Sequence, residues 1–449
     1  MNARRPRRRA LCRAFGGSMT ISYLLRLWRS SLLATFVLAC FISPTWARAD
    51  AVSFEEAVGG AVAQAPLLLA GQARTDAARA EAARAAALPD PRLIVGIANL
   101  PVTGTDAFDP RVDDMTTKQI GLMQEFPARA KREARQSLAA RTIEQTVAQT
   151  VADRLAVQEA TAAAWIDAWS AQRELAALAS LRDPASVAAR TAKARVAGGT
   201  ATVTDALATQ AALLELDNRI EAAQAQVDAA QADLSRWLGR GEPIAARGEP
   251  PPFDRLPSEP TTLLASVDDQ GPLLSWRARE ASAEAEVAAA IAEKRPDWSL
   301  EVNYGQRDRA PDGMPRSDML MVEVSIGLPV FARNRQDRGI AARRAELQAV
   351  AAEREDARRV QQAAVRRTLV GWQAARRQVT RLEQDTLPLA RDRAAVALAA
   401  YAGGADLQPW LDARSAEIEL QLEHARLLGE LGRAWAALAY LLPDKEPQP

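Results

Sequence analysis

Residues 318–328 read DMLMVEVSIGL, in which large apolar side chains alternate with mostly smaller or polar ones. The apolar set is Leu320, Val322, Val324, Ile326 and Leu328. Residues 297–305 alternate in the same way, and residues 91–99 and 117–126 do so less regularly. A period of two residues predicts a β-strand with one apolar and one polar face. Each stretch has the length of about 9–11 residues at which a tilted strand crosses a bilayer.

Alternating strands also form half-buried sheets in soluble proteins, so the pattern alone leaves both environments possible. Four strands are too few to close a barrel within one chain. A lipid environment excludes open strand edges. If the strands cross a membrane, we therefore expect several chains to contribute four strands each to one shared barrel.

The sequence repeats itself. Gly199 recurs as Gly403 and Leu234 recurs as Leu438, each 204 residues later. Matches in a common order at near-constant spacing predict two copies of one structural unit. A stretch with six prolines and two glycines separates the copies and is a linker by composition. The expected segments are a first repeat at 50–239, the linker at 240–260, a second repeat at 261–443 and a tail at 444–449.

Each copy shows the same order of elements: an Ala-rich helix, two strands, a very long helix, a glycine break and another long helix. The Ala-rich helices are expected at 53–88 and 261–295, and the very long helices at 128–196 and 332–400. A very long helix would extend about 100 Å, which exceeds any ordinary globular core. The expected fold class is mainly α with a small β part.

The N-terminal 49 residues resemble an export signal. Residues 31–43, SLLATFVLACFIS, form an apolar run of signal-peptide length, and Arg26 and Arg29 precede it. The tripeptide ARA at 47–49 fits a cleavage site. We therefore expect residues 1–49 to be removed and the mature chain to begin at Asp50.

Two further features of this region bear on processing. Met19 is the expected translation start, because the segment before it adds nothing to a signal peptide. Lipidation of Cys40 is the competing interpretation, although Leu38 is a poor fit to the small residue usual before such a cysteine. No later run of about 20 apolar residues predicts a transmembrane helix.

Charge and composition exclude several function classes. The chain has 57 Lys+Arg and 56 Asp+Glu, but nine arginines and no acid lie in residues 1–49. An acidic mature chain argues against a nucleic-acid partner. His424 is the single histidine, so His-based triads and HExxH zinc sites are excluded. We expect no catalytic residue, cofactor or metal site, and His424 is expected to be a solvated or interfacial helix residue.

Three local motifs, together with the duplication, resemble the TolC-type outer-membrane efflux proteins over residues 50–449. The motifs are LPDPRLIVGIANLP at 88–101, VEVSIGLPVFARNRQ at 322–336 and YAGGADLQPWLDAR at 401–414. The resemblance implies a homotrimer in which a 12-stranded β-barrel in the outer membrane continues into a long periplasmic α-helical barrel. Residues 124–135, QEFPARAKREAR, are similar to heavy-metal efflux members.

The resemblance also implies a constriction at the periplasmic tip. Gly199 and Gly403 would lie in the two tight helix-to-helix turns there. Asp412, in Leu-Asp-Ala, matches a lumen-facing aspartate of the family, and three copies would form an acidic ring that attracts cations. Relatives often carry a second acid three residues earlier, where this chain has Pro409.

Asp205 and Tyr401 match two family residues that help to tie the helix ends together. The basic partner usual near the tyrosine is absent, and Asp406 stands about there instead. The alternative role for Asp205, and also for Asp412, is to cap a helix N-terminus or to interact with its dipole.

The resemblance assigns a transport role with several partners. The trimer would be the exit duct of a tripartite pump, docked to a periplasmic adaptor (membrane fusion) protein and to an inner-membrane transporter, which the resemblance implies is driven by protons. Outer-membrane lipid would surround its barrel. The competing function is that of a periplasmic coiled-coil adaptor, which predicts one helical hairpin with several small β-domains. Neither function makes the chain an enzyme.

Overall fold

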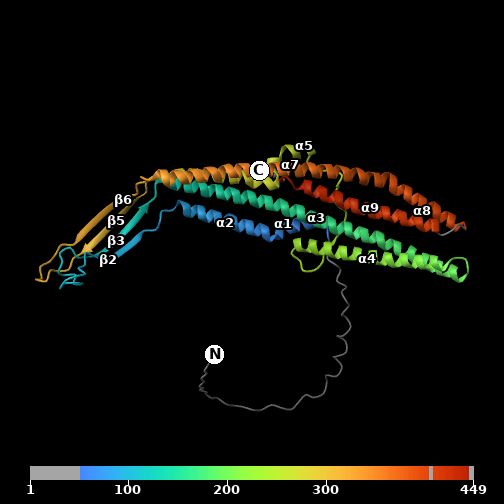
Figure 1. The fold of residues 1–449 in the computed structure, drawn as a ribbon, viewed down its shortest axis with the longest axis horizontal. Helices are drawn as coiled ribbons and strands as arrows, with labels where there is room; N and C mark the ends of the chain where they lie inside the picture. The colour runs from blue at the N-terminus through green and yellow to red at the C-terminus, as the bar shows by residue number, and fades with distance from the viewer. Residues whose placement is uncertain (1–50, 404–407, 444–449) are drawn as a thin grey trace, which may run out of the picture. The chain divides into compact units, whose positions relative to one another are not determined.

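The computed structural model describes residues 51–403 and 408–443. A four-stranded antiparallel sheet and a set of long helices make up this part of the chain (Figure 1). Several predictions concern positions outside the described residues: the signal peptide with Met19 and Cys40, Asp50, Gly404, Asp406 and the tail at 444–449.

The four predicted strands form one sheet in the order β2-β3-β5-β6. Their bounds are β2 (Arg92–Ala98), β3 (Thr117–Phe126), β5 (Trp298–Gln306) and β6 (Met319–Ile326). All neighbours pair antiparallel, and the central pairing of β3 with β5 joins the N-terminal half of the chain to the C-terminal half. The sheet is thus shared equally by the two halves.

The very long helices differ between the two halves. In the first half, α3 (Arg129–Ala197) runs through Pro184 without a break. In the second half, a 3₁₀ turn (Ala332–Asn334) leads into α7 (Gln336–Arg381), a π-helical segment η4 (Leu382–Thr386) and α8 (Leu387–Ala402). Pro388 lacks the amide hydrogen that would continue the helical ladder, and η4 ends two residues before it.

Each long helix is followed by a helix that returns alongside it: α4 (Val203–Trp237) and α9 (Gln408–Ala439). α9 packs against α3 and also against α7 and α8. Its Ile418 is fully buried with Leu178 of α3 and Leu216 of α4, whereas its Leu431 belongs to the main core. Apolar residues of α9 therefore belong to two separate buried clusters. No helix within the described residues is long and apolar enough to cross a membrane.

Prolines divide the two Ala-rich stretches expected to be helical. The first stretch forms α1 (Phe54–Gln64) and α2 (Pro66–Ala86), with Pro66 in the first turn of α2. The second forms α5 (Pro260–Ala265), two 3₁₀ turns (Val267–Asp269 and Gly271–Leu273) and α6 (Leu274–Ala292). Proline at a helix start costs no hydrogen bond, so both breaks fall where the chain can tolerate them.

The linker is tied to the core where the helices of both halves meet. Strand β1 (Ala51–Val52) pairs in parallel with β4 (Ala245–Ala246) of the linker. The indole nitrogens of Trp165, Trp372 and Trp435 donate to the carbonyls of Val52, Phe253 and Arg255, at 2.9, 2.8 and 2.7 Å respectively. These bonds fix the start of the described chain and the linker to helices of both repeats.

Candidate channel-forming surfaces

One face of the sheet is apolar across all four strands. The register aligns Leu93, Leu122, Val302 and Val322 in one row, and Val95, Ile120, Tyr304 and Leu320 in the next. Leu93, Leu122 and Val322 are 68, 53 and 60% exposed, so nothing else in the described part of the chain covers this face. An exposed apolar face of this width indicates that the sheet contacts an apolar environment.

The opposite face is the more polar one: it carries acidic residues, together with the apolar side chains of Ile94, Met123 and Met321. One row aligns Arg92, Met123, Glu301 and Glu323, and the row beside it aligns Glu125, Ser299 and Ser325. Glu301 and Glu323 are direct cross-strand partners, which places like charges opposite each other. Asn303 donates from its Nδ2 to the Oε1 of Glu301 at 2.5 Å. Such a face suits contact with water rather than with lipid.

The sheet ends in two strands that pair on one side only. β2 and β6 are the outer strands of the order β2-β3-β5-β6. Their free backbone groups are templates for pairing with another strand, and in lipid they must be paired. The chain alone therefore presents an incomplete sheet.

Hydrogen bonds cross-link the loops at the end of the sheet far from the helices. Arg316 donates from Nη1 to the carbonyl of Arg111 at 2.8 Å, and Arg307 donates from Nη1 to the carbonyl of Asp114 at 3.1 Å. These contacts join the β5–β6 loop to the β2–β3 loop. The two hairpins are thus held together at their tips as well as along β3 and β5.

A buried lysine fastens the other end of the sheet to the helices. Lys131, in the first turn of α3, is 7% exposed and lies 2.7 Å from Asp297 and 3.3 Å from Glu293. Asp297 also accepts from the backbone amide of Ala128 at 2.8 Å. Burial alone would raise the pKa of Asp297, but the bonds from Lys131 and Ala128 lower that pKa overall. The carboxylate is therefore held ionised beside the start of β5.

The first helix-to-helix turn is well formed. Gly199 has a φ of 70°, a conformation that favours glycine, and the amide of Thr200 donates to the carbonyl of Arg195 at 2.9 Å. Thr202 and Asp205 then form a capping box: each side chain accepts from the other's backbone amide, at 3.2 and 3.1 Å. The hydrogen bonds from Thr202 lower the pKa of Asp205. Asp205 thus occupies the helix-capping position considered as its alternative role.

The structure describes the residues on both sides of the second helix-to-helix turn, up to Gly403 and from Gln408 onward. Tyr401 and Gly403 end α8, and the amide of Gly403 donates to the carbonyl of Ala399 at 3.0 Å. At the start of α9, Gln408 donates from Nε2 to the Oδ1 of Asp412 at 2.8 Å.

The structure brings two of the five predicted tip residues together. Asp205 and Asp412 line one cavity of about 760 Å³, along with Thr200, Gln408 and Pro409. Gly199, Tyr401 and Gly403 are not among its lining residues. Among the described residues, the bonds of the Asp205 carboxylate go to Thr202, and none joins it to Tyr401. The roles of all five at the tip remain predictions.

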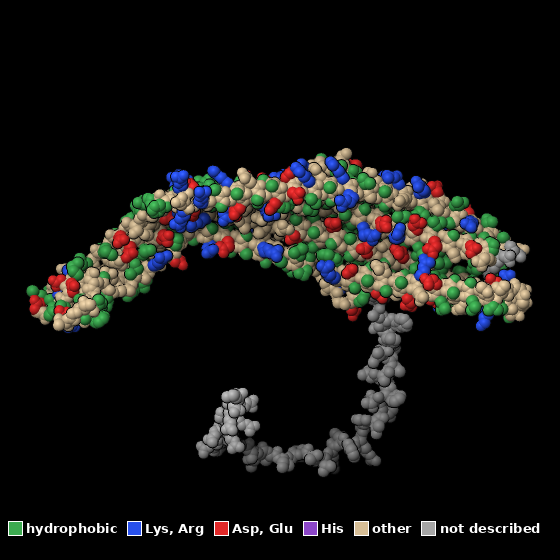
Figure 2. All heavy atoms as spheres, viewed as in Figure 1, with side chains coloured by type: hydrophobic (Ala, Val, Ile, Leu, Met, Phe, Trp, Pro, Cys, Tyr) green, Lys and Arg blue, Asp and Glu red, His purple; other side chains and the backbone are tan. Residues whose placement is uncertain are grey.

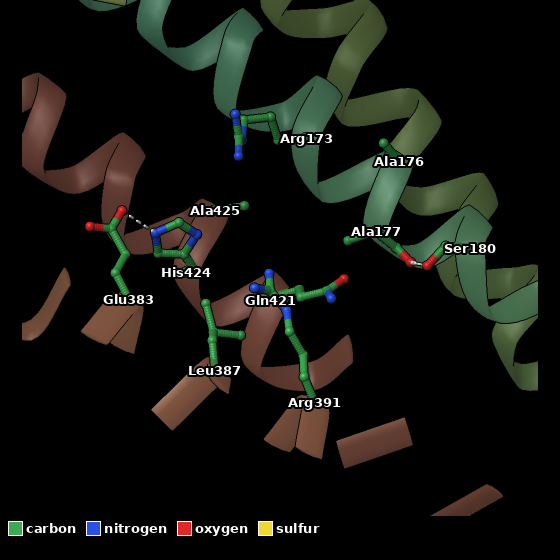
Figure 3. A pocket seen from close by; sticks show the side chains of 10 residues that line it. All are labelled: Arg173, Ala176, Ala177, Ser180, Glu383, Leu387, Arg391, Gln421, His424 and Ala425. Atoms are coloured by element: carbon green, nitrogen blue, oxygen red, sulfur yellow. Dashed lines mark hydrogen bonds and ion pairs between the residues drawn. The ribbon is translucent and has the colours of Figure 1, made fainter. Parts of the chain in front are cut away.

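His424 lines a second cavity, of about 500 Å³, between α3, α8 and α9 (Figure 3). Its Nε2 lies 2.8 Å from the Oε1 of Glu383 in η4. Arg173 of α3 and Arg391 of α8 also line the cavity. Within the described residues, no group of three or more His, Cys, Asp or Glu side chains could hold a metal ion.

The alternation in the sequence predicts a polar face that includes Glu301, Glu323 and Glu125, but it gives no reason to treat them as functional. Their significance depends on strand register, which places Glu301 opposite Glu323 and Glu125 in the neighbouring row. Alternation fixes the face of a side chain and leaves its cross-strand partner open. The only sign in the sequence that these residues could be functional is that glutamate recurs on the polar face of three strands.

Known proteins share this architecture. A family profile described as "Outer membrane efflux protein" matches residues 58–240 and 271–442. A membrane protein from Pseudomonas aeruginosa is similar in structure, with a TM-score of 0.71, 18% identity, and coverage of 86% of this chain and 92% of that chain. The outer membrane protein VceC of Vibrio cholerae gives a TM-score of 0.67, 17% identity, and coverage of 87% and 96%.

The CmeC outer membrane channel of Campylobacter jejuni gives a TM-score of 0.71, 14% identity, and coverage of 88% of this chain and 87% of that chain. No curated protein sequence gives a significant match. At these identities the solved structures establish the fold, and the profile match over most of the chain establishes the family. The chain belongs to the outer membrane efflux protein family, which confirms the resemblance seen in its sequence and makes it an outer-membrane channel protein with a periplasmic extension.

Proposed function

We propose that three copies of this chain form the exit duct of a tripartite efflux pump. The observation that carries the proposal is the four-stranded sheet with one exposed apolar face, one polar face and two edge strands. Three such sheets, joined β6 to β2, give a closed barrel of 12 strands without free edges. The apolar face meets lipid and the polar face lines water.

The helices support a duct that extends away from the membrane. α3 has 69 residues, about 100 Å at the usual helical rise. Its far end carries the turn with Gly199, where we place the contact with a periplasmic adaptor and the constriction. An inner-membrane transporter supplies the substrate through that adaptor. The alternative, that this chain is itself a periplasmic adaptor, is disfavoured. An adaptor in the periplasm would expose the apolar face of the sheet to water.

Disulfide cross-linking tests the trimer. Both cysteines lie in residues 1–49, so a mature chain cleaved after Ala49 offers a cysteine-free background. We would place one cysteine in β2, at Leu93, and a second in β6, at Leu320, Val322 or Val324 in separate variants. Oxidation in native membranes is expected to give a ladder of one, two and three chains. The detergent-solubilised particle is expected to have the mass of three chains.

A matched control uses the same β2 cysteine with a cysteine at Val302. Val302 lies in the same row as Leu93 but two strands away, with Leu122 between them. This pair should therefore give no ladder. Absence of the ladder for every β6 position, or a particle of one or two chains, contradicts the trimer. Recovery of the protein in the soluble periplasmic fraction contradicts the channel itself.

Export of heavy-metal cations is the substrate class that we propose for this duct. The glutamates of the polar sheet face support it, because carboxylates lining a pore favour cations. Deletion of the gene should lower the concentration of divalent or monovalent soft-metal salts at which cells stop growing, and the gene in trans should restore it. Increased sensitivity to organic drugs with unchanged metal sensitivity would contradict the metal proposal and leave the duct intact.

A further inference from the structure

The turn between β6 and α7 combines exposed apolar and exposed basic side chains. Residues 327–338, here called the β6–α7 turn, read GLPVFARNRQDR. Leu328, Val330 and Phe331 are 71, 71 and 79% exposed. Three large apolar side chains so close in sequence and so exposed are unusual at a surface that faces only water.

The β6–α7 turn lies at the edge of the apolar sheet face. The amide of Gly327 donates to the carbonyl of Asp297 at 2.9 Å, which fixes the turn beside the start of β5. Trp298, the next residue, pairs with Ile326 and stacks on Phe126 with ring centroids 4.2 Å apart. The exposed apolar side chains of the turn therefore follow directly on the apolar face, at the level of an aromatic pair typical of a membrane interface.

The cations of the turn have no acidic partner among the residues that the structure describes. Arg333, Arg335 and Arg338 are exposed, and their side chains make no hydrogen bond or ion pair within the described residues. Asp337, the acid of the same turn, pairs instead with Lys294 at 2.5 Å. Figure 2 shows Lys and Arg side chains gathered where the strands give way to the long helices. Three free guanidinium groups thus stand beside an apolar surface.

We propose that the β6–α7 turn binds anionic phospholipids of the periplasmic leaflet. Leu328, Val330 and Phe331 enter the acyl region, and the three arginines contact headgroup phosphates. Guanidinium groups bind phosphate through paired hydrogen bonds, and basic clusters at a membrane surface favour anionic lipid. This inference rests on the proposed function, because it requires the sheet to cross the membrane.

Brominated lipids test the inference in the intact trimer. Trp298 is the only tryptophan in the four strands, and bromine on an acyl chain quenches a nearby indole. The signal is the fluorescence difference between the protein and a Trp298→Phe variant, in vesicles that mix brominated and unbrominated lipid. We expect brominated phosphatidylglycerol to be favoured over brominated phosphatidylcholine by about 3–10-fold in relative affinity, and high salt to reduce the preference.

The variant Arg333→Gln/Arg335→Gln/Arg338→Gln should bring the two lipids to equal affinity. Its matched control is Arg366→Gln/Arg367→Gln/Arg377→Gln, which removes three exposed charges from α7 at a distance from the sheet and should keep the preference. If the first variant does not assemble, the salt series on the unmodified protein decides.

The outcomes separate the two proposals. Equal quenching by both lipids in the unmodified protein, or a preference that salt or the first variant leaves unchanged, overturns the lipid site alone. No quenching by either lipid means that the sheet does not contact the bilayer, and the proposed function then fails with it.

Discussion

Asp412 is the residue whose predicted role is most open to test. Its carboxylate accepts from Gln408 and lines the cavity shared with Asp205. Three carboxylates around one axis would attract cations. We expect Asp412→Ala to leave the trimer intact, because an exposed residue contributes little to packing. Single-channel recordings should show reduced cation selectivity and weaker block by multivalent cations.

Glu249→Ala is the matched control for Asp412→Ala, since it removes one exposed carboxylate from the linker. Selectivity and block should not change in that variant. If Asp412→Ala also leaves conductance, selectivity and block unchanged, Asp412 serves only the start of α9 and the acidic ring does not exist.

The capping box of Thr202 and Asp205 should set the local stability of the tip. Thr202→Ala removes a cap acceptor, a change that typically costs about 1 kcal/mol. Hydrogen exchange of the first-turn amides of α4 should therefore speed up by roughly fivefold, because these amides exchange by local opening. Gln210→Ala, at an exposed position of the same helix, should leave them unchanged. Unchanged exchange in Thr202→Ala would show that the turn is held by other contacts.

The same box predicts a pH dependence. The pKa of Asp205 is lowered by its bonds to Thr202. The folded tip therefore binds the proton less readily than the unfolded chain, so its stabilisation is present above the ordinary aspartate pKa and is lost as the pH falls through the lowered value. Exchange of the α4 first turn, corrected for intrinsic rates, should increase as the pH falls below about 5. Asp205→Ala should abolish that increase, and a persistent increase would assign it to another group.

Strand positions could be predicted from the sequence, whereas strand pairing could not. The alternation at residues 318–328 and 297–305 lies close to the observed β6 and β5. The pairing of β3 with β5 depends on contacts between residues about 180 apart, which no local pattern records. For the same reason, the sequence does not predict that Asn303 lies directly opposite Gly121. Pro184 and Pro388 look equivalent in sequence and predict a kink in each very long helix, yet α3 is continuous through Pro184 and only Pro388 follows a π-helical segment.

Gly121 is required by the pairing of β3 with β5. Its cross-strand partner is Asn303, which is 3% exposed, and a Cβ on residue 121 would overlap the Asn303 side chain and lie 2.9 Å from the carbonyl of Val302. We expect Gly121→Ala to impair barrel assembly, seen as loss of the heat-modifiable folded band in gels. The main reason is that the buried Asn303 side chain, which is bonded to Glu301, cannot move away from the added Cβ without losing that bond.

Two companion variants make this prediction specific. Gly96→Ala is the control, because a Cβ at this glycine on β2 meets nothing within 4 Å in the chain. Adding Asn303→Ala to Gly121→Ala should restore much of the folded band by removing the larger clash. A normal folded band in Gly121→Ala alone would mean that the strands pair in a different register.

The two repeats meet the linker at one aromatic cluster, which ties the halves of the molecule together. Phe253 of the linker packs edge-on against Trp169 and beside Trp435, with ring centroids 6.3 and 5.7 Å apart. Its ring also fills the space above Gly432, where a Cβ would meet it at 2.9 Å. The linker is thus a packed part of the fold, in spite of its six prolines.

Phe253→Ala should loosen the attachment of this linker to the helices without dissociating the trimer. Removing a buried phenylalanine typically costs about 3–5 kcal/mol, and we expect most of that loss to fall on the linker that carries the ring. Trypsin should then cut at Arg247 or Arg255 much faster than in the unmodified protein, while the sheet and its cross-linking ladder persist. Asp254→Ala, the exposed neighbour, should leave the cutting rate unchanged. If trypsin cuts Phe253→Ala no faster than the unmodified protein, the Phe253 ring is not needed to hold the linker. The β1–β4 pairing and the indole bonds from Trp372 and Trp435 would then be sufficient, because those contacts do not involve the ring.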